Sequence, residues 1–130
     1  MIYRIAFVFL LLFTGCSDYP IYKEKKESLQ NIHCLNIIAL EDSDIQIAKK
    51  YLNNFEFSET CKFKFEIKPH LIHKCSNPKV KSLGSDFDGY VLIKLSKNNK
   101  LYFRSQVDFK GDEYAPHLKK LLIDFIEELH

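Results

Sequence analysis

The chain has 130 residues, with 19 Lys and Arg against 17 Asp and Glu, and 46% of its residues are hydrophobic. This length is typical of one domain with a modest core and argues against a second domain. The near balance of charge argues against nucleic acid as a partner, because binding it normally needs a clustered basic excess.

The first fifteen residues have the features of a secretory signal. One basic residue, Arg4, precedes an apolar run from Ile5 to Phe13. The run is too short to cross a bilayer, which takes about 20 residues, but it suits the hydrophobic segment of a signal, about 7–15 residues long. Residues 1–15 are therefore predicted to be a signal peptide, and the mature chain is expected outside the cytoplasm.

The run Leu12-Phe13-Thr14-Gly15-Cys16 resembles the cleavage box of bacterial lipoproteins, in which signal peptidase II leaves a diacylated Cys as the new N-terminus. Phe13 departs from that pattern, since an aliphatic residue is usual three places before the Cys. The resemblance implies a lipid on Cys16, palmitate among its acyl chains, that holds the protein on a membrane. Ser17 after the Cys implies the outer membrane rather than the inner, with the domain in the periplasm. An uncleaved anchor or an ordinary secretory signal remains the alternative.

Residues 16–30 hold Pro20 and a charged run at 23–27, without sustained apolar periodicity. Such a segment is predicted to be a solvated tether. A single domain is then expected to cover residues 31–130.

The domain is expected to begin with a strand and a helix. Residues 32–40 are apolar on both alternating sets, which is typical of a strand in the middle of a sheet. Ser43 and Gln46 form a capping-box pattern, and apolar residues follow at helical spacing.

Residues 61–68 alternate apolar and charged side chains, which predicts a strand with one buried face. Pro69 is expected to break the strand, and residues 70–75 to return as a short partner that places Cys61 opposite Cys75. This register predicts a Cys61–Cys75 disulfide and a free thiol on Cys34. Residues 76–89 are predicted to form a loop.

Two further strands, at residues 91–95 and 101–109, are predicted to form a hairpin. A three-residue loop with Asn99 left-handed would place Leu95 opposite Leu101 and keep the apolar side chains together. Apolar residues at 118, 121, 122, 125, 126 and 129 then predict an amphipathic C-terminal helix, with Pro116 in its first turn.

These elements predict an α+β two-layer sandwich of order β-α-β-β-β-β-α, with a mainly antiparallel sheet and both helices on one face. The order resembles that of small periplasmic sandwiches, such as the lipopolysaccharide-translocon lipoprotein, without shared motif residues. That likeness concerns architecture and carries no function.

Motifs for chemistry are weak. His73 and Cys75 invite a metal or redox interpretation, but strand alternation separates His70 from them and a disulfide would use up the thiolate. Residues 85–89 match only a fragment of a calcium loop, and no nucleophile or metalloprotease motif is present. No cofactor and no enzymatic activity are predicted.

The uncovered face of the sheet is the predicted partner-binding surface. It is expected to carry five residues of types that interfaces favour or tolerate: Tyr90, Leu92, Tyr102, Arg104 and Gln106. Packing between neighbours, with Leu92 opposite Arg104 and Lys94 opposite Tyr102, would explain the same residues without a partner.

The sequence thus predicts a non-enzymatic envelope lipoprotein that is bound to the membrane by its lipid and that recognises another envelope protein. One alternative is an immunity or inhibitor lipoprotein that plugs a toxin or hydrolase with residues 85–89. The other is a metal- or redox-active envelope protein using His73 and Cys75.

Overall fold

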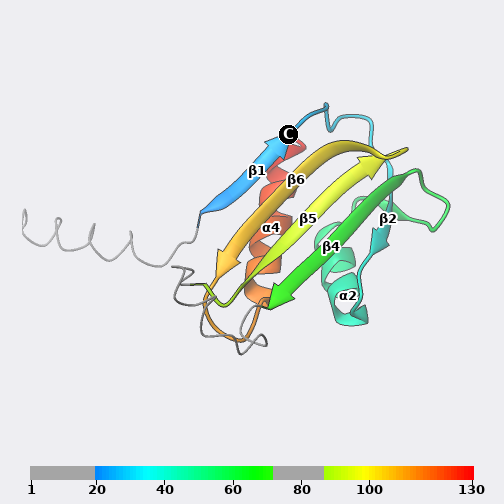
Figure 1. Cartoon of the computed structure of the whole chain (residues 1–130). Helices are drawn as coiled ribbons and strands as arrows, with labels where there is room; N and C mark the ends of the chain where they lie inside the picture. The colour runs from blue at the N-terminus through cyan, green and yellow to red at the C-terminus, as the bar shows by residue number, and fades with distance from the viewer. Residues whose placement is uncertain (1–19, 72–86) are drawn as a thin grey trace, which may run out of the picture.

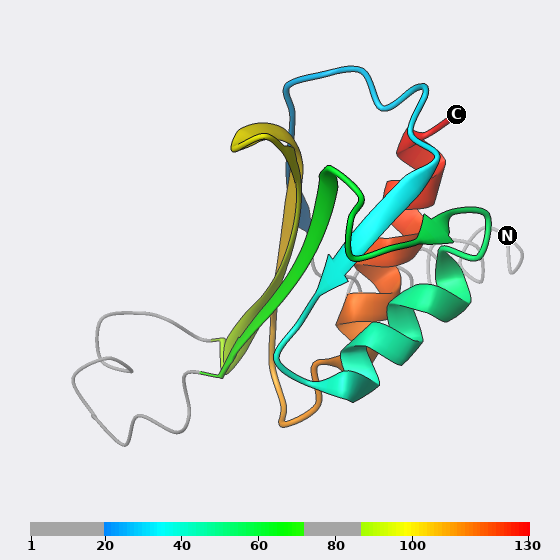
Figure 2. The ribbon, with the colours of Figure 1, turned by 90° about the vertical axis from the view of Figure 1, so that its right-hand side faces the viewer.

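The computed structural model describes residues 20–71 and 87–130, which fold into a six-stranded sheet with two helices on one of its faces (Figures 1 and 2). The elements are β1 Ile21–Lys25, β2 Cys34–Ile38, α2 Asp42–Tyr51, β3 Glu56–Phe57, β4 Phe63–Leu71, β5 Gly89–Lys97, β6 Lys100–Phe109 and α4 Ala115–Glu128. This arrangement confirms the predicted α+β two-layer sandwich.

The strand order in the sheet is β1-β6-β5-β4-β2-β3. The pairs β1–β6, β6–β5 and β5–β4 are antiparallel, whereas β2 runs parallel to both β4 and β3. The expectation that β2 lies in the middle of the sheet is wrong, because only the two-residue β3 separates it from the edge. Leu35 of β2 is buried under α2, while Ile38 is 42% exposed.

Strand β1 corrects the predicted tether. Residues 21–25 pair with β6 from Ile21↔Val107 to Lys25↔Phe103, and Leu29 after them is buried in the core. Their helix-facing positions hold few apolar residues, so periodicity did not reveal a strand. Lys23 instead binds α4, with its Nζ 2.6 Å from Glu128 Oε1 and 3.2 Å from Asp124 Oδ1.

The hairpin between β5 and β6 has a two-residue turn, so the predicted three-residue loop is wrong. Asn98 and Asn99 both have positive φ, at 51° and 64°, and Lys97 pairs with Lys100. Left-handed Asn residues suit this tight turn. A β-bulge then places Leu95 opposite Phe103 while Ser96 remains opposite Leu101, so Tyr102 is the extra residue. The bulge keeps the apolar side chains on one face, which the looser loop was expected to do.

Strand β4 continues through Pro69, which was expected to end it. Pro69 pairs with Val91 and the strand reaches Leu71 opposite Gly89. The pairing of β2 with β4 ends at Ile38↔Glu66, so beyond this point β5 is the one neighbour of β4 among the described strands. Proline is tolerated on such an edge. The predicted return strand is therefore wrong for residues 70 and 71, and residues 72–75 lie outside the described residues.

The disulfide joins Cys34 to Cys61, with the two Cα atoms 6.0 Å apart. The predicted Cys61–Cys75 bridge is wrong, and Cys34 is not a free thiol; Cys75 lies outside the described residues. Cys34 starts β2 and Cys61 precedes β4, its parallel neighbour, so the fold places them together. A bridge across a sequence separation of 27 residues contributes about 3.5 kcal/mol in the chain-entropy model.

The two helices cover the same face of the sheet (Figure 2). Helix α4 confirms the predicted stripe, with Leu118, Leu121, Leu122 and Phe125 fully buried. The Phe125 ring lies 5.2 Å from that of Phe65 and 5.4 Å from that of Phe103.

Helix α2 starts two residues earlier than predicted, at Asp42. Glu41 occupies the N-cap position and no side chain caps the helix, so the capping box at Ser43 is not formed. Asp44 is buried and accepts hydrogen bonds from the Tyr114 hydroxyl, at 2.8 and 3.0 Å from its two carboxylate oxygens. This contact ties the start of α2 to the start of α4.

Candidate functional site

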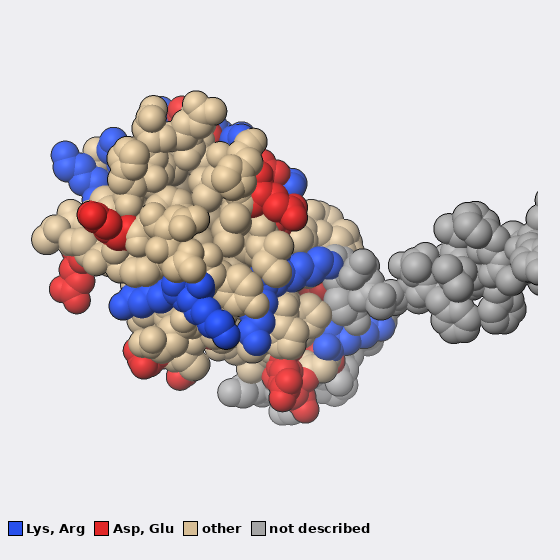
Figure 3. All heavy atoms as spheres, turned by 180° about the vertical axis from the view of Figure 1, so that it is seen from behind, with Lys and Arg blue, Asp and Glu red and all other residues tan. Residues whose placement is uncertain are grey.

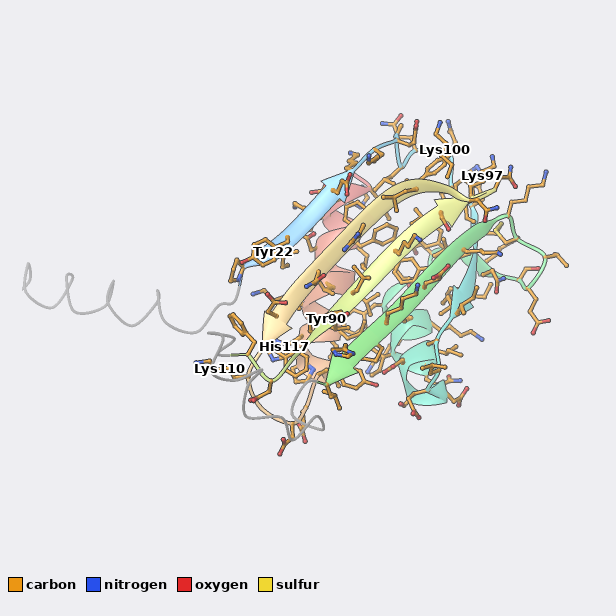
Figure 4. All side chains as sticks on the ribbon, in the orientation of Figure 1. Tyr22, Tyr90, Lys97, Lys100, Lys110 and His117 are labelled. Carbon is orange, nitrogen blue, oxygen red and sulfur yellow. A yellow bond between two sulfur atoms is a disulfide. The ribbon has the colours of Figure 1, made fainter. Side chains whose placement is uncertain are left out.

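The sheet face opposite the helices is the candidate site, and we call it the open face. Side chains alternate along each strand, so the residues between the buried Phe65, Ile67, Val91 and Ile93 point away from the core. Figure 4 views this face, with Tyr22 and Tyr90 toward the end where β1 and β5 begin and Lys97 and Lys100 at the opposite hairpin end. The open face comprises Tyr22, Glu24, Lys64, Glu66, Lys68, His70, Tyr90, Leu92, Lys94, Ser96, Leu101, Arg104, Gln106 and Asp108.

Strand pairing arranges these residues in rows across the sheet. One row runs Glu24, Arg104, Lys94, Glu66, and the next runs Tyr22, Gln106, Leu92, Lys68. The expected neighbours Leu92 with Arg104 and Lys94 with Tyr102 are wrong, because the bulge shifts the register. Leu92 faces Gln106 and Lys94 faces Arg104.

Four of the five predicted binding residues lie on the open face, at positions 90, 92, 104 and 106. Tyr102 does not, because the bulge turns it to the helix side. Its ring meets Phe63 edge-on at 5.3 Å, next to the core. Its carbonyl accepts a hydrogen bond from the Lys26 amide at 2.9 Å. Tyr102 is therefore a packing residue in this structure.

Tyr22 is an open-face residue that the sequence analysis did not place there, and it is 58% exposed. A hollow of about 300 Å³ is lined by Tyr22, Lys23, Glu24, Arg104 and Gln106. The signal was present in the alternation of Ile21, Lys23 and Lys25 with Tyr22 and Glu24. This alternation did not lead to a predicted strand, because Pro20 and the charged run at 23–27 favoured a tether.

Several contacts order the open face. The rings of His70 and Tyr90 stack at 5.1 Å, and Gln106 Nε2 donates a hydrogen bond to Asp108 Oδ1 at 3.0 Å. Glu66 Oε2 lies 3.0 Å from Lys68 Nζ, along its own strand. These contacts hold part of the open face in place.

Two other hollows lie at the helices. One of about 250 Å³, between β2 and α2, is lined mainly by polar side chains such as Asn36, Asp42 and Gln46. The other, of about 200 Å³, is mostly apolar and lies between the ends of the helices, near Phe55 and Leu129. Neither gathers the nucleophile, base and oxyanion donor that a catalytic site combines.

The pKa values of Asp44, Tyr114 and His117 are shifted by burial and by neighbouring side chains. Burial raises the pKa of Asp44, an effect that the hydrogen bond from Tyr114 opposes and that the charge of Glu41 reinforces. Burial and then Asp44 raise the pKa of Tyr114. Burial, with Lys120 nearby, lowers the pKa of His117, whose ring stacks on Phe109 at 5.0 Å.

Metal ligands do not gather in the described part of the chain, where no group of three His, Cys, Asp or Glu residues could hold an ion. His73 and Cys75, the residues proposed for metal or redox chemistry, lie outside it. Of the calcium-like fragment, Asp88 is described. Its Oδ2 accepts a hydrogen bond from the Gly111 amide at 2.7 Å, which joins the start of β5 to the segment after β6.

The predicted lipidation site, Cys16, also lies outside the described residues. Within residues 20–71 and 87–130, no helix is both long enough and apolar enough to cross a membrane.

Comparison of the chain with protein-family models, with curated proteins and with solved structures found no match.

Proposed function

We propose that this chain is a non-enzymatic envelope lipoprotein, anchored through Cys16, whose α+β domain binds another envelope protein with its open face. The anchor is supported by the apolar run, the cleavage box and Cys16 in the sequence. The observation that supports the binding role is the uncovered sheet face. It combines aromatic, aliphatic and cationic side chains on the antiparallel strands β1, β6, β5 and β4.

The composition of the open face suits recognition. Tyr and Arg are enriched among residues that anchor protein interfaces, and Tyr22, Tyr90 and Arg104 all lie here. An antiparallel sheet also commonly leaves one face in water, so the residue types alone do not require a partner. The exposed Tyr22 beside a hollow favours binding, because packing within the sheet does not cover its ring.

Strand β1 limits how far the domain stands from its anchor. With β1 starting at Ile21, only residues 17–20 separate it from Cys16. An extended chain spans at most about 3.3–3.6 Å per residue, so this leash reaches roughly 17 Å. The end of the sheet where β1 begins then faces the membrane, and the Asn98-Asn99 hairpin points away from it.

Anchoring is tested by metabolic labelling with a palmitate analogue in cells that produce the wild type or Cys16→Ser. We expect label on the wild type alone, and a mature mass that lacks residues 1–15. Equal labelling of both chains would contradict the anchor.

Partner binding is tested by pull-down of the tagged lipoprotein after mild cross-linking. We expect Leu92→Ala/Gln106→Ala to lose a protein that the wild type retains. The matched control, Lys50→Ala/Gln46→Ala on the exposed side of α2, is expected to keep it. Loss in both variants, or in neither, would contradict the open face as the binding surface.

A further inference from the structure

Two cations lie side by side near the centre of the open face. Lys94 of β5 is the register partner of Arg104 of β6. Directly opposed residues of an antiparallel pair have their Cβ atoms about 4.5–5.5 Å apart, and like charges there are destabilising. The strand backbones therefore hold two positive side chains side by side.

The carboxylates opposite these two cations form their ion pairs with other lysines. Glu66 is opposite Lys94, but its ion pair is with Lys68 at 3.0 Å. Glu24 is opposite Arg104, but its Oε1 lies 3.1 Å from Lys26 Nζ. In the described ranges, neither Lys94 nor Arg104 has a carboxylate within ion-pair distance.

The surroundings of the pair suit a side chain that carries an anion. Arg104 shares its hollow with the exposed Tyr22 and with Gln106. Leu92 lies in the adjacent row of β5, two residues from Lys94. An aromatic ring, an amide and an aliphatic group therefore border the two cations on the same face.

We propose that Lys94 and Arg104 bind an acidic segment of the partner protein, with an Asp or Glu carboxylate seated between them. A guanidinium offers a carboxylate two parallel hydrogen bonds, and the ammonium adds a second charge. Tyr22 and Leu92 then contact the carbon atoms that flank the carboxylate. This inference rests on the proposed function and specifies the chemistry of the partner.

The helix side offers a matched control. Figure 3 shows this side, where lysine and arginine side chains form a band among acidic ones. Lys50 of α2 and Lys119 of α4 are exposed there, on different helices and without strand register between them. A variant of this pair removes the same net charge from the protein and leaves the open face unchanged.

The test uses the mature lipidated chain in nonionic detergent and a fluorescent hexaglutamate peptide as the probe. Fluorescence anisotropy at low salt is expected to show binding that Lys94→Gln/Arg104→Gln weakens at least fivefold. Lys50→Gln/Lys119→Gln is expected to change it less than twofold. Thermal unfolding of each variant shows that the fold is kept.

Equal weakening by both variants, or no binding of the peptide by the wild type, would overturn the proposal. So would binding to phosphatidylglycerol vesicles, but not to the peptide, that depends on Lys94 and Arg104, because the ligand would then be lipid. If the cellular pull-down depends on Leu92 and Gln106 but not on the two cations, this inference fails while the proposed function stands. If the pull-down does not depend on the open-face residues at all, both this inference and the proposed function fail.

Discussion

The two faces of the sheet differ in composition and in the contacts that their side chains make. The helix-covered face is a close-packed cluster of fully buried side chains, among them Phe65, Phe103 and Phe125. The open face has partly exposed aromatic and charged residues, and two adjacent cations without an ion pair in the described chain. The stability of the fold therefore depends mainly on side chains of the covered face, whereas those of the open face contribute little to it.

The largest loss of stability is expected from a cavity under the helices. Phe125→Ala removes a ring that contacts Phe65 and Phe103 at once. Truncation of a buried Phe typically costs about 3–5 kcal/mol. Urea unfolding should show this loss, and a change below about 1 kcal/mol would mean that α4 does not pack on the sheet as described.

The disulfide is expected to contribute nearly as much. Cys34→Ser/Cys61→Ser should lower the free energy of unfolding by about 3.5 kcal/mol, because the unfolded chain gains freedom. Peptide mapping of the unreduced protein checks the pairing directly. A fragment that links Cys61 to Cys75 instead would contradict the fold near β2.

A third change affects the edge of the covered face. A Cβ at Gly89 would collide with the carbonyl oxygen of His70 and come within 3.0 Å of the Phe109 ring. Gly89→Ala is therefore expected to cost about 1–3 kcal/mol, as overpacking does. Thermal unfolding measures it, and an unchanged midpoint would show that β4 and β5 do not pair at this end.

A smaller, pH-dependent effect is expected where β1 meets α4. The hydrogen bond from Lys23 lowers the pKa of Glu128, and Glu128, then Asp124, raise the pKa of Lys23. A lowered carboxyl pKa contributes stability above its unfolded pKa that is lost as pH falls through the folded pKa. The raised Lys23 pKa contributes stability that is lost as pH rises through its own folded value.

As pH falls, Lys23→Gln should therefore lose less stability than the wild type. The difference should be less than about 1 kcal/mol, because water screens these charged groups. Unfolding measured between pH 7 and pH 3 checks it. Parallel curves for wild type and variant would mean that β1 is not tied to α4 by these ions.

The smallest stability change is expected on the open face. Lys94→Gln/Arg104→Gln removes a repulsive pair and should alter the free energy of unfolding by no more than about 0.5 kcal/mol. Urea unfolding beside that of Phe125→Ala gives the contrast between the faces. A loss as large as that of the core variant would show that these cations stabilise the fold.

Local patterns made the covered face predictable from the sequence. The alternation around Phe65 and Ile67 and the stripe from Leu118 to Phe125 each depend on a few neighbouring residues. The predictions failed where contacts between segments far apart in the sequence determine the structure. Cys34 meets Cys61 only because β2 joins β4 in parallel, and the bulge at Tyr102 depends on how β6 fits β5 and Lys26. Alternation placed four of the proposed binding residues on the open face, whereas placing Tyr22 there depended on recognising β1.

The central claim is that the open face, and not the helix face, binds a partner in the envelope. Site-specific photo-cross-linking in living cells tests it, with a photoreactive residue placed in turn at Leu92, Gln106, Lys50 and Lys119 of the lipidated chain. We predict that the first two positions yield one discrete cross-linked protein and that the last two yield none. A product from the helix positions alone, or from no position, would contradict the claim.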